Sequence, residues 1–214
     1  KIYSAKKLTT YQKKKIEKML EVDVRIPGVC WPLDTIFNQE GQFVGYVMAG
    51  FTGKSLKETI FAKKSLVENG WMRSSLVELC LTWLNTVKQL HDINVIIGDV
   101  SPLSIFVKSA REIFLIEADA FQVEDFPCTH RSIDFVAPEL RGHKPGTYLQ
   151  TKEQEEYAIA TLIFMVLLPG KHPFSCYDGN LSRLRCLEFP YPLGERTSSN
   201  TPGKPWNYIW SNLP

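Results

Sequence analysis

A long helical stripe followed by several short apolar runs constrains the fold of this chain more than any other feature. Apolar residues recur at spacings of three and four over residues 76–90, the period of a helix that buries one face. Short apolar runs follow at 95–97, 105–107 and 113–116, and their length suits buried strands that bracket loops. Residues 153–168 begin acidic and then become apolar all round, which predicts a helix in the centre of a domain.

The segment before these elements predicts a smaller, strand-rich part. Residues 1–3 have the pattern of the end of a strand, and Thr9 or Thr10 is expected to cap a helix that ends near Glu21. Residues 29–48 alternate loosely around a turn signal, which predicts a β-hairpin. The order of elements therefore predicts an α+β chain of two parts with a cleft between them.

Composition and charge exclude several classes of function. With 214 residues, 44% of them hydrophobic, the chain can form one domain or two small lobes around a cleft. Its net charge of +2 gives no strong attraction to nucleic acid, so direct nucleic-acid binding is not expected. The longest apolar run, 158–168, is too short to span a bilayer.

A cluster of lysines predicts a solvated helix face and comprises Lys1, Lys6, Lys7, Lys13, Lys14, Lys15 and Lys18.

The cysteines indicate a reducing compartment. The chain has five of them, widely spaced and without a C-x-x-C pair, which argues against a disulfide framework and against a zinc site. A cytoplasmic location is therefore expected. Cys80 falls on the helical stripe and is expected to belong to the core.

The stretch most informative about function is 90–107. A Leu-His pair is followed by Ile97-Gly98-Asp99-Val100 and then by another apolar strand. Taken alone, Asp99 is better explained as a turn residue before Pro102. The whole stretch, however, resembles the catalytic loop H-R-D-L-x-x-x-N of protein kinases. That resemblance implies that Asp99 accepts or orients the proton of an attacking hydroxyl.

Further matches follow in the order of the kinase fold. Residues 112–119 lie where kinases have an apolar strand ending in D-F-G, and Phe135–Glu139 ends in an intact A-P-E. Glu155 replaces the usual Asp at the start of the helix that anchors the catalytic loop, and His172-Pro173-Phe174 matches a common H-P-F ending. The chain is most similar to a bacterial group of kinase-like proteins with I-G-D-V and D-A-D motifs, often linked to DNA-binding or tellurite-resistance-type modules.

This resemblance implies a bilobal protein-kinase-like α+β fold. Residues 1–50 would form a truncated, β-rich N-lobe, and residues 51–214 would form a mainly helical C-lobe that lacks its last helices. The Gly-rich phosphate loop of kinases is expected to lie before the first residue. ATP with Mg²⁺ or Mn²⁺ is the implied cofactor pair.

The same resemblance assigns the nucleotide-binding residues. Lys1 is placed like the strand lysine that holds the phosphates, and Glu17 lies at a suitable distance to pair with it, with Glu21 as the alternative. The backbone of Met48-Ala49-Gly50 would form the hinge that meets an adenine. Without the resemblance, Lys1 would be a frayed terminus and Glu17 a solvated carboxylate.

The expected metal site departs from the kinase pattern. Ser104 stands where a metal-binding Asn is expected, and Glu117 stands where a metal-binding Asp is expected. Magnesium requires near-ideal octahedral oxygen geometry. The extra methylene of Glu moves the carboxylate by a distance at which misplacement costs ~100-fold in rate. Asp119 is either a substitute ligand or a loop carboxylate that bonds backbone groups.

Gly98 replaces the Arg that kinases use to hold a phosphorylated activation loop. Phosphorylation at Thr129 or Ser132 is therefore expected not to be required for ordering that segment. Activity that depends on such a phosphate would contradict this expectation.

Three functions are compatible with these residues. The first is ATP-dependent phosphotransfer to Ser or Thr of a protein, supported by Lys1, Glu17 and Asp99. The second is a pseudokinase that binds nucleotide or serves as a scaffold, favoured by the altered metal ligands. The third is a kinase-fold enzyme that acts on a small molecule, since fold does not determine function. A protein substrate or regulatory partner is expected, and a membrane partner is not.

Overall fold

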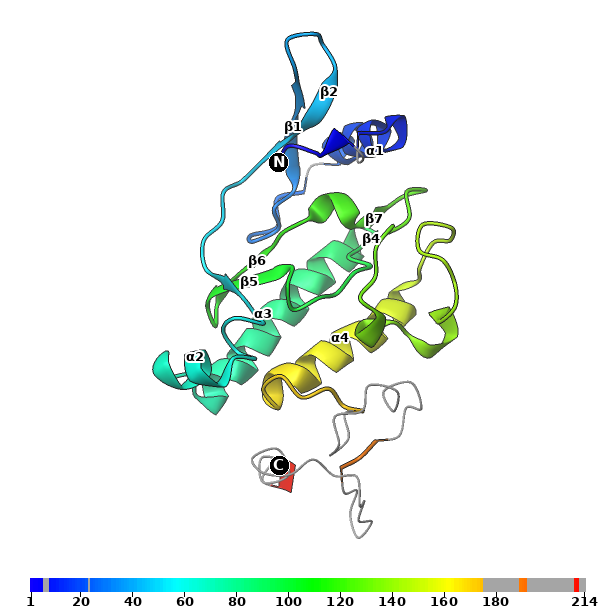
Figure 1. Cartoon of the computed structure of the whole chain (residues 1–214). Coiled ribbons are helices and arrows are strands. Elements are labelled where there is room, and N and C mark those ends of the chain that lie inside the picture. The colour runs from blue at the N-terminus through cyan, green and yellow to red at the C-terminus, as the bar shows by residue number, and fades with distance from the viewer. Residues whose placement is uncertain (6–7, 23, 175–188, 192–209, 212–214) are drawn as a thin grey trace.

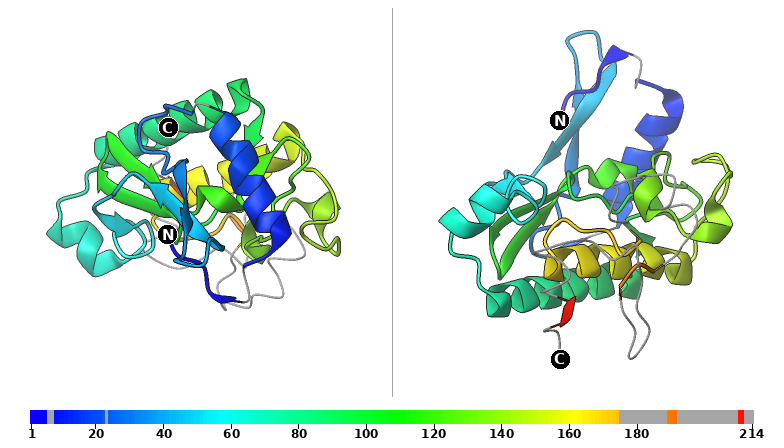
Figure 2. Two further views of the ribbon diagram at one scale, coloured as in Figure 1. Left: turned by 90° about the horizontal axis from the view of Figure 1, so that it is seen from above. Right: turned by 60° about the horizontal axis from the view of Figure 1, so that its bottom comes forward.

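The computed structural model describes residues 1–5, 8–22, 24–174, 189–191 and 210–211. The described part is α+β, with four α-helices and three small sheets. A β-hairpin and helix α1 stand at one end, and the long helices α3 and α4 lie at the other (Figures 1 and 2). The chain after residue 190 is rich in Pro, Gly, Ser and Asn, which predicts mostly loop, and it lies almost entirely outside the described residues.

The first helix and the hairpin form as the local sequence predicts. Helix α1 spans Thr10–Glu21, and the Thr9 hydroxyl caps it by accepting a hydrogen bond from the Gln12 amide at 3.1 Å. Strands β1 (Pro32–Phe37) and β2 (Phe43–Met48) pair antiparallel. The predicted cap and hairpin are therefore confirmed.

Residues 1–3 lie along the other edge of β2. The Tyr3 amide donates to the Val44 carbonyl at 2.9 Å, and the Tyr46 amide donates to the Lys1 carbonyl at 3.0 Å. Gly45 makes this pairing possible, since a Cβ there would lie 2.1 Å from the Lys1 oxygen. The first residues thus extend the hairpin as strand-like backbone.

The larger part begins with a second small sheet. Strands β3 (Lys54–Ser55), β5 (Ile105–Ser109) and β6 (Glu112–Leu115) pair antiparallel in the order β3-β5-β6. A short helix, α2 (Lys63–Glu68), follows β3. The strands confirm two of the short apolar runs as buried β-structure.

The two long helices form the base of the molecule. Helix α3 spans Arg73–Asp92 and packs against α4, Lys152–Leu167. Cys80 is buried on α3 as expected. Strands β4 (Val95–Ile96) and β7 (Gln122–Val123) pair beside them. Both predicted helices are confirmed to within a few residues at each end.

A close backbone contact joins the hairpin part, which contains α1, β1 and β2, to the larger part, which contains β3 through α4. The Leu115 amide donates to the Gly28 carbonyl at 2.7 Å, and the Cys30 amide donates to the Leu115 carbonyl at 3.0 Å. Gly28 has φ +82°, and a Cβ there would lie 2.1 Å from the Ile113 oxygen. Glycine is required at this crossing for both reasons.

Between β6 and α4 the chain forms three short 3₁₀ turns, η2 (Ala118–Ala120), η3 (Ile133–Phe135) and η4 (Pro138–Leu140). Cys30, Cys80 and Cys128 are buried free thiols. Across the described ranges, every helix is too short or too polar to cross a bilayer.

Candidate functional site

The loop that carries Asp99 is tied to the start of helix α4. Glu155 is 1% exposed, and its Oε1 accepts from the Gly98 amide at 2.6 Å. Its Oε2 lies 2.6 Å from His91 Nε2 at the end of α3. The expectation that Glu155 anchors the loop is confirmed, because one carboxylate holds both the loop and the preceding helix.

Asp99 lies half-buried at the end of this anchored loop. Its Oδ1 accepts a hydrogen bond from the Ser132 amide at 2.7 Å. Within the described part of the chain, no residue donates to its Oδ2. One oxygen therefore fixes the carboxylate, and the other is available to an incoming donor.

Gly98 has a structural reason to be glycine. Its φ is +74°, and a Cβ there would lie 2.4 Å from the Cys128 Cβ and 2.8 Å from its Sγ. The arginine that the kinase motif has at this position would collide with Cys128 in the backbone conformation seen here. The glycine at this position and the close packing of Cys128 are thus linked.

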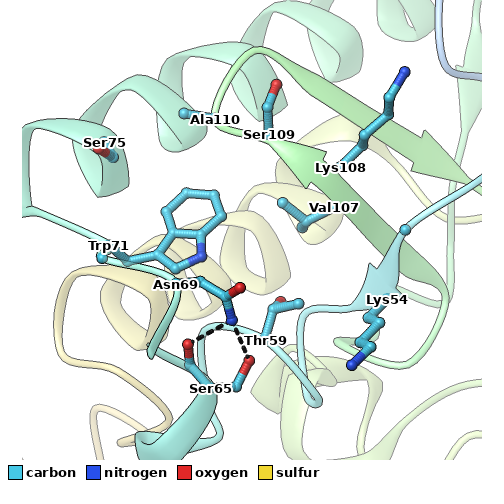
Figure 3. Close-up of a pocket in the computed structure, with 12 residues that line it drawn as sticks. Lys54, Thr59, Ser65, Asn69, Trp71, Ser75, Val107, Lys108, Ser109 and Ala110 are labelled. Carbon is cyan, nitrogen blue, oxygen red and sulfur yellow. Dashed lines mark hydrogen bonds between the residues drawn. The ribbon is translucent and has the colours of Figure 1, made fainter. Parts of the chain in front are cut away.

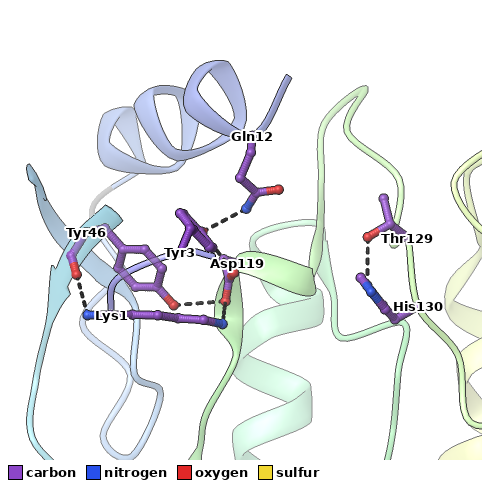
Figure 4. A network of polar contacts seen from close by, with 7 residues as sticks. All are labelled: Lys1, Tyr3, Gln12, Tyr46, Asp119, Thr129 and His130. Carbon is purple, nitrogen blue, oxygen red and sulfur yellow. Dashed lines mark hydrogen bonds and ion pairs between the residues drawn. The ribbon is translucent and has the colours of Figure 1, made fainter. Parts of the chain in front are cut away.

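Asp119 is the centre of a buried polar network (Figure 4). Its Oδ1 accepts from Lys1 Nζ at 2.7 Å and from the Tyr46 hydroxyl at 2.9 Å. Its Oδ2 accepts from the Tyr3 hydroxyl at 2.9 Å, which in turn accepts from Gln12 Nε2 at 2.8 Å. Burial by itself would raise the pKa of Asp119, but the Lys1 ammonium and the three hydrogen bonds together hold that pKa below its usual value.

The predicted pairing of Lys1 with Glu17 is wrong for this conformation. Lys1 pairs with Asp119, whereas Glu17 lies on the exposed face of α1, 3.6 Å from Lys13 Nζ. The alternative, Glu21, lies 2.8 Å from Lys18 Nζ. The spacing along the chain was suitable for Glu17, but the rotation of α1 turns its side chain away from Lys1.

The buried charge on α1 is a lysine instead. Lys15 is 1% exposed, although a solvated face was expected for it. Burial lowers its pKa to about 8, an effect that the nearby Cys128 and Asp119 only partly offset. No described carboxylate forms an ion pair with it. Its place beside Ile16 and one turn before Met19, both fully buried, was the helical-period signal that could have revealed this.

The predicted metal ligands are not brought together. Both Asp119 oxygens are occupied by hydrogen bonds, and the Ser104 hydroxyl donates to the Ser101 carbonyl at 3.1 Å. Glu117 is exposed, in a left-handed conformation with φ +63°. Among the described residues, no group of three or more His, Cys, Asp or Glu side chains is placed to hold a metal. In this conformation the three side chains do not fit a metal ion.

The predicted hinge follows β2 directly. Met48 ends that strand, and Ala49 and Gly50 continue as exposed, irregular backbone. Within the described ranges, neither Ala49 nor Gly50 takes part in a main-chain hydrogen bond. Their polar groups are thus available to a ligand, and their contact with an adenine stays a prediction.

Besides a cavity of about 520 Å³ that borders Gly28 and helix α3, two cavities lie outside this network. The first, about 470 Å³, lies between β3, α2 and the β5–β6 turn, where Asn69 Nδ2 donates to Ser65 (Figure 3). None of the predicted site residues lines it. The second, about 590 Å³, lies beyond Ser132 and is bordered by Arg131 and His172. Sequence patterns indicated neither cavity, because both depend on how distant segments meet.

Comparison with known proteins gives one relationship. The chain is 26% identical over 157 residues to the protein kinase YegI of Escherichia coli strain K12, and equally to YegI of strain O157:H7. The matched region is 69% of this chain and 24% of each relative, so the chain spans about a quarter of their length. No family model matches the chain. The chain is thus distantly similar to a named protein kinase.

Proposed function

We propose that this chain is a kinase-like nucleotide-binding domain that transfers the γ-phosphoryl group of ATP to a Ser or Thr hydroxyl of a protein. The observation that carries this proposal is the geometry of Asp99. Its carboxylate lies on a loop held by Glu155, and its Oδ1 is fixed by the Ser132 amide. The distant similarity to protein kinase YegI supports the same class of reaction.

In the proposed reaction Asp99 positions the acceptor. Its second oxygen accepts a hydrogen bond from the substrate hydroxyl and takes up the hydroxyl proton as the new P–O bond forms. The bond between the γ-phosphorus and its bridging oxygen breaks, and ADP leaves. A carboxylate whose loop is anchored and whose first oxygen is already bonded loses little freedom when the second oxygen orients a nucleophile. ATP, when bound, supplies the phosphoryl group.

The nucleotide would lie between residues 1–50 and 51–214, which the proposal treats as the two lobes of a bilobal fold. Met48-Ala49-Gly50 would meet the base, and Ala49 and Gly50 would contribute backbone groups that make no main-chain hydrogen bond in the described part of the chain. Lys1 would hold the phosphates, which requires it to leave Asp119. The arrangement described above gives no metal site, so no step of this proposal depends on one.

Asp99→Asn tests the catalytic role. The amide oxygen can still accept from Ser132, so the melting temperature should stay close to that of the wild type. Transfer of labelled phosphate from ATP to myelin basic protein should fall at least ~100-fold, because the proton acceptor is lost. Asp125→Asn, an exposed aspartate outside the network, is the matched control and should keep full activity. Equal activity of the wild type and Asp99→Asn would refute the role.

A pseudokinase is the second candidate, favoured by the full occupation of Asp119 and by Ser104. Thermal stability measured with ATP, with and without Mg²⁺ or Mn²⁺, separates the two. A metal-dependent rise in melting temperature together with transfer supports the kinase. A rise that needs no metal, without transfer, supports the nucleotide-binding pseudokinase. No rise with any nucleotide would contradict both.

A further inference from the structure

Arg131 has buried hydrogen-bond donors without acceptors. Its Nη2 donates to the His143 carbonyl at 2.8 Å, and its guanidinium carbon lies 4.9 Å from the centre of the Tyr148 ring. Its Nε and Nη1 are buried, and neither has a hydrogen-bond partner in the described part of the chain. Buried polar groups are nearly always paired, so these two donors indicate a missing acceptor. The Tyr148 hydroxyl is likewise buried and without a partner at hydrogen-bond distance among the described residues, although the charge of Arg131 partly offsets the burial that raises the pKa of Tyr148.

This guanidinium is adjacent to the proposed catalytic residue. Arg131 directly precedes Ser132, whose amide holds Asp99 at 2.7 Å. Arg131 also borders the cavity of about 590 Å³, which we call the Arg131 cavity. A ligand group in this cavity would therefore lie next to the acceptor hydroxyl that Asp99 is proposed to orient.

The walls of the Arg131 cavity suit part of a peptide better than a small inorganic ion. Ile133, Val136, Leu140 and Pro145 supply apolar surface, and the Ile133 side chain is 65% exposed. The volume lies in the range of pockets that enclose organic ligands. Apolar walls beside a charged group are the usual composition of such sites. A short peptide segment, with one anionic and one apolar side chain, fits this description.

The charges around the cavity favour an anion. Arg131 and Arg141 line it and outweigh Asp134, the one acidic residue among its described lining residues. The planar edge of a guanidinium matches the two oxygens of a carboxylate in a bidentate pair. No described carboxylate forms an ion pair with Arg131. A carboxylate from another molecule would supply the acceptor.

We propose that the Arg131 cavity recognises an acidic side chain of the protein substrate, beside the acceptor Ser or Thr, through a pair between Arg131 and the substrate carboxylate. This inference rests on the proposed function and names the substrate class. It makes Arg131 a residue that determines specificity, distinct from Asp99, which acts on the acceptor hydroxyl.

The test uses binding, so it does not require phosphotransfer. The probes are fluorescent serine-centred peptides in which one glutamate is moved through each flanking position, and a second set with glutamine instead. We expect one position at which glutamate binds the full chain about 10- to 100-fold more tightly than glutamine, the range of a charge-assisted hydrogen bond. Arg131→Gln should remove that preference.

Lys144→Gln is the matched control. It removes a positive charge from the same segment without altering the described lining of the cavity, and it should leave the glutamate preference intact. Because the peptides vary while the protein stays the same, wild-type binding alone can refute the proposal, even if Arg131→Gln does not fold. Equal binding of glutamate and glutamine peptides at every position would refute it. An equal loss in Lys144→Gln would also refute it, as general electrostatic attraction.

Two further outcomes separate this inference from others. A glutamate preference with no phosphotransfer would support the Arg131 cavity and contradict the proposed reaction. Orphaned donors are also expected if Arg131 instead binds a phosphate on Thr129 or Ser132 of its own segment. In that case phosphorylation at either residue would raise the thermal stability of the chain, and the unphosphorylated chain would bind the glutamate and glutamine peptides equally, which would overturn the proposal.

Discussion

At the scale of single residues, Gly98 and Lys15 both lie close to Cys128. The loop before Asp99 turns through a positive φ at Gly98, and the missing side chain leaves room for the Cys128 thiol. Lys15 approaches the same cysteine from α1, and burial raises the pKa of the Cys128 thiol to about 11. At pH 7 the thiol is therefore neutral and cannot serve as the counter-charge of Lys15.

Replacing Gly98 with alanine should destabilise the protein by roughly 2–5 kcal/mol. The left-handed backbone accounts for about 1–2 kcal/mol of this, and overpacking against Cys128 adds about 1–3 kcal/mol. Gly142→Ala is the control, since it has φ +87° but no neighbour within 4 Å. Urea unfolding of both variants measures the difference. Equal losses would show that the contact with Cys128 has no energetic effect.

Replacing Lys15 with methionine should stabilise the protein at pH 7. The pKa of Lys15 is about 8 in the folded protein against 10.5 when solvated. The unfolded state therefore binds more protons between these values, and wild-type stability rises with pH across that window. Below pH 8 the penalty is complete, so Lys15→Met should gain on the order of 3 kcal/mol, and the gain should shrink toward pH 10.5.

Lys14→Met is the control for this prediction, because Lys14 is the exposed neighbour on the same helix. Its unfolding free energy should differ little from that of the wild type at any pH. The prediction for Lys15 is contradicted if its variant is less stable than the wild type at pH 7. That result would mean that the ammonium is paired in solution.

At the scale of elements, helix α4 acts as a support for the loop that carries Asp99. Its first turn is fixed by a capping box between Thr151 and Gln154. That turn presents Glu155 to the loop amide of Gly98 and to the His91 ring of α3. The position of Asp99 therefore depends on two helices that are far apart in sequence.

Glu155→Gln should loosen this support. The amide oxygen can still accept from Gly98, but the charge that strengthens both contacts is lost. We expect a loss of about 1–3 kcal/mol in the free energy of unfolding, together with a fall in phosphotransfer. Glu156→Gln, at the exposed neighbouring position, should change neither. A stability loss that is equal in the two variants would contradict the role of Glu155.

At the scale of the whole molecule, Asp119 joins the hairpin part to the larger part. Lys1, Tyr3 and Tyr46 all come from the first 46 residues, and Asp119 comes from η2. The Gly28–Leu115 contact is the second connection. Movement of one part against the other would have to break or rearrange the Asp119 network.

The stability contributed by Asp119 should disappear in acid. Its folded pKa lies below its unfolded value of 3.8. Its contribution is therefore complete above that unfolded value and is lost as the pH falls through the folded pKa. Asp119→Asn should cost about 1.5–3 kcal/mol at pH 7, since it removes the charge that strengthens the hydrogen bonds of this network, and the cost should vanish at low pH.

The control for Asp119 is Asp92→Asn, which breaks the exposed ion pair with Lys88. Surface pairs contribute little to stability, so its unfolding curve should nearly match that of the wild type from pH 2 to pH 7. A cost of Asp119→Asn that does not vary with pH would show that its hydrogen bonds, and not its charge, hold the two parts together.

Much of the candidate site was predictable, and particular residues show why the rest was not. Asp99 and its anchor Glu155 were recognised from motifs of adjacent residues. The partner of Lys1 was assigned by spacing, which is uncertain by a turn of helix, and the rotation of α1 placed Glu17 on the wrong side. Lys15 was assigned to a solvated face because its charge was given more weight than its position on the buried stripe of α1. The orphaned donors of Arg131 have no signature in local sequence.

The sequence by itself determined most of the secondary structure and the position of the Asp99 loop along the chain, because helical period and the Thr9 and Thr151 caps depend on neighbours a few residues away. Only the tertiary structure decided which charges meet. Lys1 and Asp119 lie 118 residues apart in sequence but 2.7 Å apart in space. Ion pairs require atoms within a few ångströms of each other, and that proximity is a property of the folded chain as a whole.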